Sequence, residues 1–295
     1  MTAPGYADRY VSAPDGLRLH ARDYGAGAIA ALPLVCLPGL ARTAADFDVL
    51  ARALAQAETP RRVVAIDYRG RGLSAYDDDP DHYHLAVELT DLLAVLTALG
   101  VARAIFLGTS RGGLLTMLLA PHRPGMIAGA ILNDIGPVVA PQGLVRIKTY
   151  IGKLPEPSSM ADAADVLKRL FSGQFPKLTA EDWMRFAERT FQERDGRIVP
   201  TYDPRLARTL ESIDPEQPIP SLWKEFDALA SVPLMIIRGA LSDILLPATV
   251  ALMRERRPLE LFEVPDQGHA PLLMEPDVIA RIASFAAQCD CGARS

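Results

Sequence analysis

Short hydrophobic runs alternate with longer stretches of helical character along most of this 295-residue chain. The short runs are rich in β-branched and aliphatic side chains and are typical of buried strands: Leu34–Leu37, Val63–Asp67, Arg103–Leu107, Met126–Leu132, Pro233–Ile237 and Leu259–Val264. Helices are predicted at Ala44–Gln56, Leu85–Leu99 and Leu114–Ala120. Asp15-Gly16 separates two earlier strand-like runs and indicates an opening hairpin. This alternation predicts an α/β fold with a mostly parallel, doubly wound sheet and helices on both faces.

The alternation stops between Gly136 and Ala230. Short helices interrupted by prolines are predicted there: Leu144–Leu154, Met160–Phe171, Ala180–Glu193, Pro204–Ser212 and Ser221–Leu229. Both tryptophans and most phenylalanines lie in this part of the chain, and we expect most of them to form its own small core. The sequence therefore predicts a core made of residues 1–136 and 231–295, interrupted by a helical cap at 137–230. Some aromatic side chains of the cap should face the cleft beneath it.

A serine stands between glycines at the junction of a predicted strand and a predicted helix. The sequence Gly108-Thr109-Ser110-Arg111-Gly112 fits Gly-x-Ser-x-Gly, the nucleophile elbow, in which a sharp turn lifts the serine hydroxyl clear of the sheet. Without its neighbours, this motif could equally be an ordinary strand-to-helix turn with a capping serine. The strand before it and the helix after it favour the elbow.

A nucleophilic serine needs a base and an acid, and both can be found after later strands. His269 follows the run ending at Val264, and Asp243 follows the run ending at Ile237. The order Ser, Asp, His is that of the α/β-hydrolase triad, so Asp243 is predicted to be the acid. Asp134, which follows another strand-like run, is the alternative candidate for the acid. Its structural interpretation is an aspartate that caps a turn.

Taken together, these motifs resemble those of the α/β-hydrolase superfamily, in its cofactor-free branch with a cap. The resemblance extends from about residue 8 to about residue 288 and also includes Leu37-Pro38-Gly39-Leu40 and the segment Asp67–Ser74. It implies an α/β-hydrolase fold without a cofactor. It also implies that Ser110 attacks a carbonyl carbon, that His269 moves the proton, and that Asp243 orients the imidazole.

The resemblance further implies an oxyanion hole made by the backbone N–H groups of Leu40 and Arg111. Many relatives carry His-Gly where this chain has Pro38-Gly39, and Gly39 still permits the tight turn. The Arg111 side chain could meet an anionic group of the substrate, although a local ion pair is the simpler expectation.

The triad residues predict hydrolysis of a carboxylic ester, thioester or lactone of a small, largely apolar substrate through an acyl-enzyme. Hydrolysis of a C–C bond in a ring-cleavage product, or cofactor-free perhydrolysis, would use the same residues. The alternative from a different functional class is a receptor-like protein that binds a ligand and turns it over slowly. A serine at the elbow argues against relatives that use an aspartate nucleophile.

Charge and composition limit the remaining possibilities. The net charge of −5 and the lack of a basic stripe give no support to a nucleic-acid partner. The segment from Asp77 to His84 has carboxylates and two histidines, but its proline and aspartates are typical of a solvated turn, so no metal is predicted. Three cysteines without a disulfide framework, no apolar leader and no membrane-length run lead us to expect a cytoplasmic protein. The sequence leaves the oligomeric state open.

Overall fold

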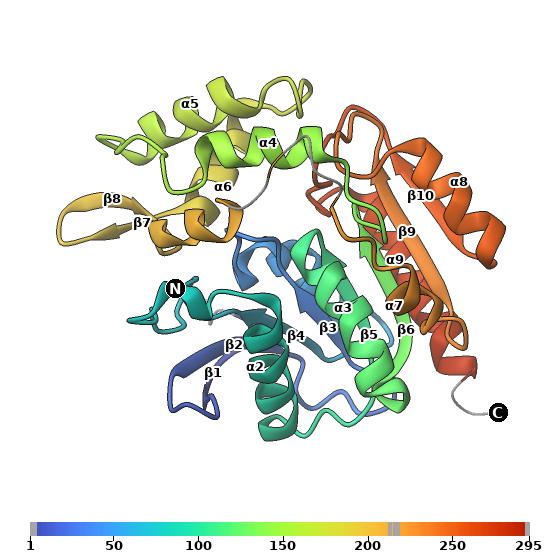
Figure 1. Cartoon of the computed structure of the whole chain (residues 1–295). Coiled ribbons are helices and arrows are strands. Elements are labelled where there is room, and N and C mark those ends of the chain that lie inside the picture. Colours follow the sequence, from blue (N-terminus) through green and yellow to red (C-terminus); the bar gives the residue numbers. More distant parts are fainter. Residues whose placement is uncertain (1–4, 212–213, 215–218, 293–295) are drawn as a thin grey trace.

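The computed structural model describes residues 5–211, 214 and 219–292. Within this part of the chain, eight strands form one sheet in the order β1-β2-β4-β3-β5-β6-β9-β10 (Figure 1). Their bounds, in chain order, are β1 Ala7–Ser12, β2 Arg18–Tyr24, β3 Leu34–Leu37, β4 Val63–Asp67, β5 Ala104–Thr109, β6 Ile127–Asn133, β9 Leu234–Gly239 and β10 Glu260–Val264. The first two strands pair antiparallel, as do β2 and β4, and the remaining pairs are parallel. The predicted α/β-hydrolase sheet is confirmed.

Helices cover both faces of this sheet because alternate side chains of each central strand point to opposite sides. In β3, Val35 packs into the core on one face and Cys36 into the core on the other. The first face is covered by α2 Leu85–Ala98, α3 Arg111–His122 and α8 Pro247–Arg256, and the second by α1 Asp48–Ala55 and α9 Pro276–Gly292. In Figure 1, α2 and α3 lie in front of the sheet and α9 behind it. Short 3₁₀ turns occur at η1 Ala44–Phe47, η2 Pro80–His82 and η3 Pro124–Met126.

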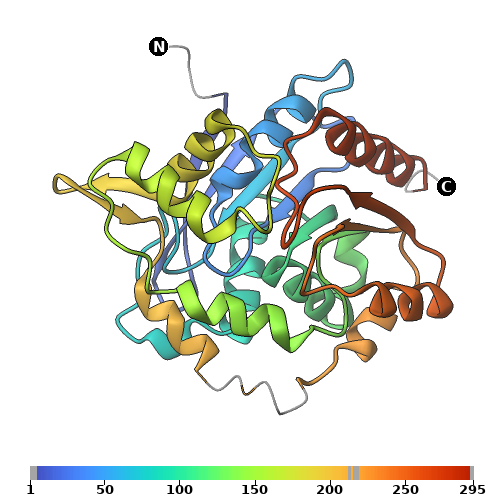
Figure 2. The same cartoon turned by 90° about the horizontal axis from the view of Figure 1, so that it is seen from above.

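Residues 137–230, here called the inserted segment, run from the end of β6 to the start of β9 and lie outside the large sheet. Figure 2 looks down on them from above. Their elements are α4 Pro141–Tyr150, α5 Met160–Phe171, α6 Ala180–Thr190, β7 Phe191–Arg194, β8 Arg197–Pro200, η4 Pro204–Leu210 and α7 Trp223–Asp227. Phe175, Trp183, Phe186 and Phe191 pack together as a separate small core. This is the aromatic core expected from the sequence.

The helix predictions within the inserted segment were right in kind but not at every boundary. The bounds of α5 are as predicted, and α6 begins with a capping box in which Thr179 and Asp182 bond to each other's backbone. However, α6 ends at Thr190 because a hairpin, β7–β8, begins there. Its turn residues Asp195 and Gly196 both have positive φ, the backbone that an Asp-Gly turn favours. The helix predicted at Pro204–Ser212 corresponds to the 3₁₀ helix η4, and its predicted end at Ser212 lies outside the described residues.

Candidate active site

Ser110 occupies a sharp turn between β5 and α3. Its backbone has φ 50° and ψ −112°, a strained conformation for a residue with a side chain. The turn is possible because its neighbours lack side chains: a Cβ atom on Gly108 would lie 2.4 Å from the backbone of Gly112, and one on Gly112 would lie 2.1 Å from the Leu37 carbonyl oxygen. The close approach of strand and helix therefore requires glycine at both positions.

The structure brings His269 to this serine. His269 lies in the loop after β10, and its Nε2 atom is 2.8 Å from Ser110 Oγ. Its side chain is only 7% exposed, and its backbone N–H donates to Gln174 Oε1 of the inserted segment at 2.8 Å. The imidazole is thus held at the serine by a loop of the sheet and by the segment above it.

The other imidazole nitrogen, Nδ1, faces Asp134 and not Asp243. Asp134 follows β6 with φ 57°, and its Oδ2 atom lies 2.7 Å from His269 Nδ1. The same oxygen accepts a hydrogen bond from the Ser242 hydroxyl at 2.5 Å, and Oδ1 accepts one from the Gly239 N–H at 2.9 Å. The Asp134 side chain is completely buried, so these hydrogen bonds fix its orientation.

The prediction that Asp243 lies against the imidazole is therefore wrong, and the reason is an arginine of the inserted segment. Arg146 of α4 donates from Nε to Asp243 Oδ2 at 2.6 Å and from Nη2 to Oδ1 at 2.8 Å. Burial raises the pKa of Asp243, but these hydrogen bonds and the charge of Arg146 outweigh it, and the net pKa lies below the usual value. A positive charge on His269 also lowers it, so Asp243 remains near the site. Nothing in the sequence around Arg146 marks this pairing.

The backbone N–H groups of Leu40 and Arg111 lie on the loop after β3 and at the first residue of α3. Among the described residues, neither N–H donates to an acceptor. Gly39, next to Leu40, is close enough to the serine that its Cβ would lie 3.9 Å from Ser110 Cβ. Ion pairs connect these two parts of the chain. The buried Arg71 donates to the Leu40 carbonyl oxygen at 2.8 Å and pairs with Glu88. Glu88 also pairs with Arg111 at 2.6 Å. The Arg111 side chain is therefore used in a local ion pair.

Ser110 and His269 open onto a cavity whose walls are mostly apolar. The inserted segment supplies much of its lining, including Ile147, Ile151, Leu154, Leu167, Phe171 and Phe175. Phe175 belongs to both the small core and the cavity wall. An aliphatic or aromatic group fits such a lining.

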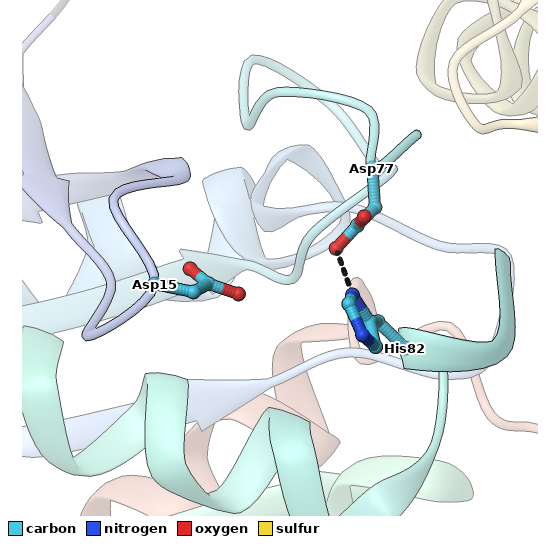
Figure 3. A group of neighbouring side chains, drawn as sticks. All are labelled: Asp15, Asp77 and His82. Atoms are coloured by element: carbon cyan, nitrogen blue, oxygen red, sulfur yellow. Dashed lines mark hydrogen bonds and ion pairs between the residues drawn. The ribbon is translucent and has the colours of Figure 1, made fainter. Parts of the chain in front are cut away.

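A second group of polar residues, away from this cavity, is explained by ion pairs. Figure 3 shows Asp15, Asp77 and His82, which lie close enough together to hold a metal ion. Arg69 Nη1 already lies 2.9 Å from Asp15 and 2.6 Å from Asp77, and His82 Nδ1 lies 3.0 Å from Asp77. A guanidinium between the two carboxylates accounts for the cluster.

Residues 34–282 match the alpha/beta hydrolase family. The chain belongs to that family. Its sequence is 35% identical to the 3-hydroxybutyrate-oligomer hydrolase of Cupriavidus necator, over 85% of this chain and 87% of the relative. It is 27% identical to the mouse sn-1-specific diacylglycerol lipase ABHD11, over 88% and 82% of the two chains.

Solved structures of other α/β-hydrolases support the same assignment. A crystal structure of an alpha/beta hydrolase from Novosphingobium aromaticivorans is 42% identical in sequence, with a TM-score of 0.89. The match covers 96% of this chain and 99% of the other. In the described part of this α/β-hydrolase, no helix is both long and apolar enough to span a membrane.

Proposed function

We propose that this chain is a serine hydrolase of carboxylic esters, with Ser110 as nucleophile, His269 as base and Asp134 as the acid. The observation that carries the proposal is the continuous set of hydrogen bonds from Ser110 Oγ through the imidazole to Asp134, at 2.8 and 2.7 Å. Its position at the wall of an apolar cavity supports an ester with a largely apolar portion.

In this mechanism, Ser110 Oγ attacks the carbonyl carbon while its proton passes to His269 Nε2. Asp134 holds Nδ1 protonated and stabilises the imidazolium that forms. The free N–H groups of Leu40 and Arg111 bind the oxyanion, and each such donor contributes about 10²–10³ in rate. The imidazolium then protonates the leaving alcohol, and a water molecule repeats the sequence to release the acid and restore Ser110.

The relatives guide the choice of substrate. The Cupriavidus necator relative acts on 3-hydroxybutyrate oligomers, and ABHD11 is a lipase for diacylglycerol, so both names describe ester cleavage. The greater sequence identity of the first relative, 35% against 27%, favours short aliphatic esters, including those between hydroxy acids. Thioesters and lactones would react through the same acyl-enzyme.

Hydrolysis of p-nitrophenyl esters from acetate to decanoate, by wild type and Ser110→Ala, tests the proposal. We expect repeated turnover with an optimum at short chains, and a loss of about 10⁴-fold or more in kcat in the variant. Ser221→Ala, which removes an exposed hydroxyl on a loop, is the matched control and should behave as wild type. Activity retained in Ser110→Ala would refute the assignment, and one acylation without turnover would favour the receptor-like alternative.

A further inference from the structure

The cavity beside Ser110 is lined by two arginines whose surroundings differ. Arg42 is neutralised: its Nε and Nη2 atoms donate to both oxygens of Asp46, at 2.7 and 2.5 Å, and its Nη1 atom donates to Thr190 at 2.6 Å. Its guanidinium also lies over the ring of Phe186, 4.6 Å from the centre. The hydrogen-bonding groups of Arg42 are therefore occupied by the protein itself.

Arg189, in the last turn of α6, has no such partner. Its Nη1 atom donates to Met274 Sδ at 3.0 Å, and a thioether sulfur is a weak acceptor. Across the described residues it forms no ion pair, and its Nε and Nη2 atoms have no hydrogen-bond partner. The negative charges of Asp46 and Asp48 both act on Arg189, but the two oxygens of Asp46 are bound to Arg42, and Asp48 pairs with Arg52.

The surroundings of Arg189 would make the lack of a partner unfavourable once a substrate displaced water from its guanidinium. The side chain is half-buried, and burial lowers the pKa of its guanidinium, although an arginine remains charged in proteins. Much of the rest of the cavity wall is aliphatic or aromatic. A neutral apolar substrate that filled this cavity would displace water from Arg189 and supply nothing in its place, which is unfavourable for a charge. A carboxylate would supply two acceptors in a geometry that matches a guanidinium.

We propose that Arg189 binds a free carboxylate at the end of the substrate, so that the enzyme prefers esters that carry an acid group. This inference rests on the proposed function and narrows its substrate class. The apolar wall then receives the chain between the carboxylate and the ester, while Ser110 attacks the ester carbonyl. Oligoesters of hydroxy acids and monoesters of dicarboxylic acids have this pattern, whereas triglycerides do not.

The test compares the linear dimer of 3-hydroxybutyrate with its primary amide, which differs only in the charge at the acid end. We expect wild type to prefer the acid. Arg189→Gln should lower the ratio of kcat/KM for acid to that for amide by about 10- to 100-fold, the range expected for a hydrogen-bonded charge. Arg189→Lys should give an intermediate ratio because it retains the charge without the planar fork. An unchanged ratio in Arg189→Gln overturns the proposal.

Arg185→Gln is the matched control. Arg185 lies on the same helix, one turn earlier, but it is exposed and pairs with Glu181 at 2.5 Å. Removing its charge changes the net charge of the protein by the same amount as Arg189→Gln. The acid-to-amide ratio should stay at the wild-type value, and a similar fall in both variants would mean that the effect is a long-range one, which also overturns the proposal.

Calorimetric titration separates this inference from the proposed function, because binding requires no turnover. Ser110→Ala should bind the acid dimer about tenfold or more tightly than the amide, and adding Arg189→Gln should remove the difference. That result supports the carboxylate site even if no ester is hydrolysed. Equal binding of acid and amide by Ser110→Ala overturns it even if simple esters are good substrates.

Discussion

At the scale of single residues, two aspartates follow neighbouring strands, and their surroundings distinguish them. Asp134 is fully buried, and its carboxylate receives hydrogen bonds from Gly239, Ser242 and His269. Asp243 is partly exposed and is bound by both branches of the Arg146 guanidinium. Of the two, Asp134 is the one hydrogen-bonded to His269 Nδ1, and our proposal therefore gives it the role of the acid.

The paired variants Asp134→Asn and Asp243→Asn measure this difference. Asp134→Asn should reduce kcat by about 10⁴-fold, because the amide stabilises the wrong tautomer of His269. Asp243→Asn should reduce it by less than about tenfold, since it removes an ion pair and leaves the imidazole in place. Steady-state kinetics with a p-nitrophenyl ester gives both values. The reverse order of severity would return the acid role to Asp243.

Gly112 allows a prediction that concerns stability alone. A Cβ atom there would meet the carbonyl of Leu37, a backbone group that cannot rotate away. Gly112→Ala should lower the free energy of unfolding by about 3 kcal/mol, the upper part of the range for overpacking. Gly125→Ala is the control, because nothing lies within 4 Å of its Cβ position. Urea unfolding compares the two, and equal stabilities would contradict the close approach of β3 and α3.

The sequence was sufficient to predict that Ser110 and His269 meet, but not which aspartate the imidazole faces. Ser110 is marked by local features, the glycines around it and the strand–helix junction, and His269 by its place after a late strand. The difference between the two aspartates depends on Arg146, which lies 97 residues before Asp243, in a segment without the strand pattern of the sheet. Chain order alone carried no information about that contact.

At the scale of elements, Glu88 connects three parts of the fold. It lies on α2, pairs with Arg71 beneath the loop after β3, and pairs with Arg111 at the start of α3. Burial raises the pKa of Glu88, but the two arginines outweigh it and hold the pKa below its ordinary value of 4.5. The ionised carboxylate is therefore the form that the folded protein stabilises.

Glu88→Gln should lower the free energy of unfolding by about 3–5 kcal/mol at neutral pH, because the buried guanidinium of Arg71 and the largely buried one of Arg111 lose their counterion. The pH dependence has a defined sign. A folded-state pKa below 4.5 means that Glu88 stabilises the fold fully above pH 4.5 and loses this effect as the pH falls through the folded value. Denaturant unfolding of wild type and Glu88→Gln should show a constant difference in free energy of unfolding above pH 4.5, and this difference should become smaller below pH 4.5. A difference that grows as the pH falls would contradict a stabilising role of the ionised Glu88.

Among the secondary-structure elements, those of the sheet were easier to predict than those of the inserted segment. Strands such as β4 are buried on both faces and appear as continuous hydrophobic runs. The helices of the inserted segment are short, and α4 begins earlier than predicted because Pro141 fits the first turn of a helix. The β7–β8 hairpin was missed, although Asp195-Gly196 is a recognisable turn signal.

At the scale of the whole molecule, the two cores on the faces of the sheet determine which cysteines react. Cys36 and Cys289 are buried, and burial raises the pKa of both thiols, that of Cys289 to about 11. Cys291 is exposed. Cys289 is buried although it lies near the end of the described residues, because α9 continues past it and packs its side chain against Gly129 of β6.

Titration with a thiol reagent should therefore modify one cysteine rapidly in the native protein and all three after denaturation in urea. Cys291→Ser should abolish the rapid phase and leave the free energy of unfolding unchanged within about 0.5 kcal/mol. Rapid modification of a second thiol in the native state would mean that α9 separates from the sheet more readily than its packing indicates.

The adjacency of β6 and β9 has a consequence for how such enzymes can be redesigned. Because these parallel strands end at the same edge of the sheet, each is followed by an aspartate near the same histidine, and the acid that we propose could in principle be supplied from either strand. The inserted segment places the Arg146 guanidinium on Asp243, while Asp134 faces the histidine. Moving the proposed acid from Asp134 to Asp243 would then require changes at Arg146 in the inserted segment and at the two aspartates, with no change to the sheet.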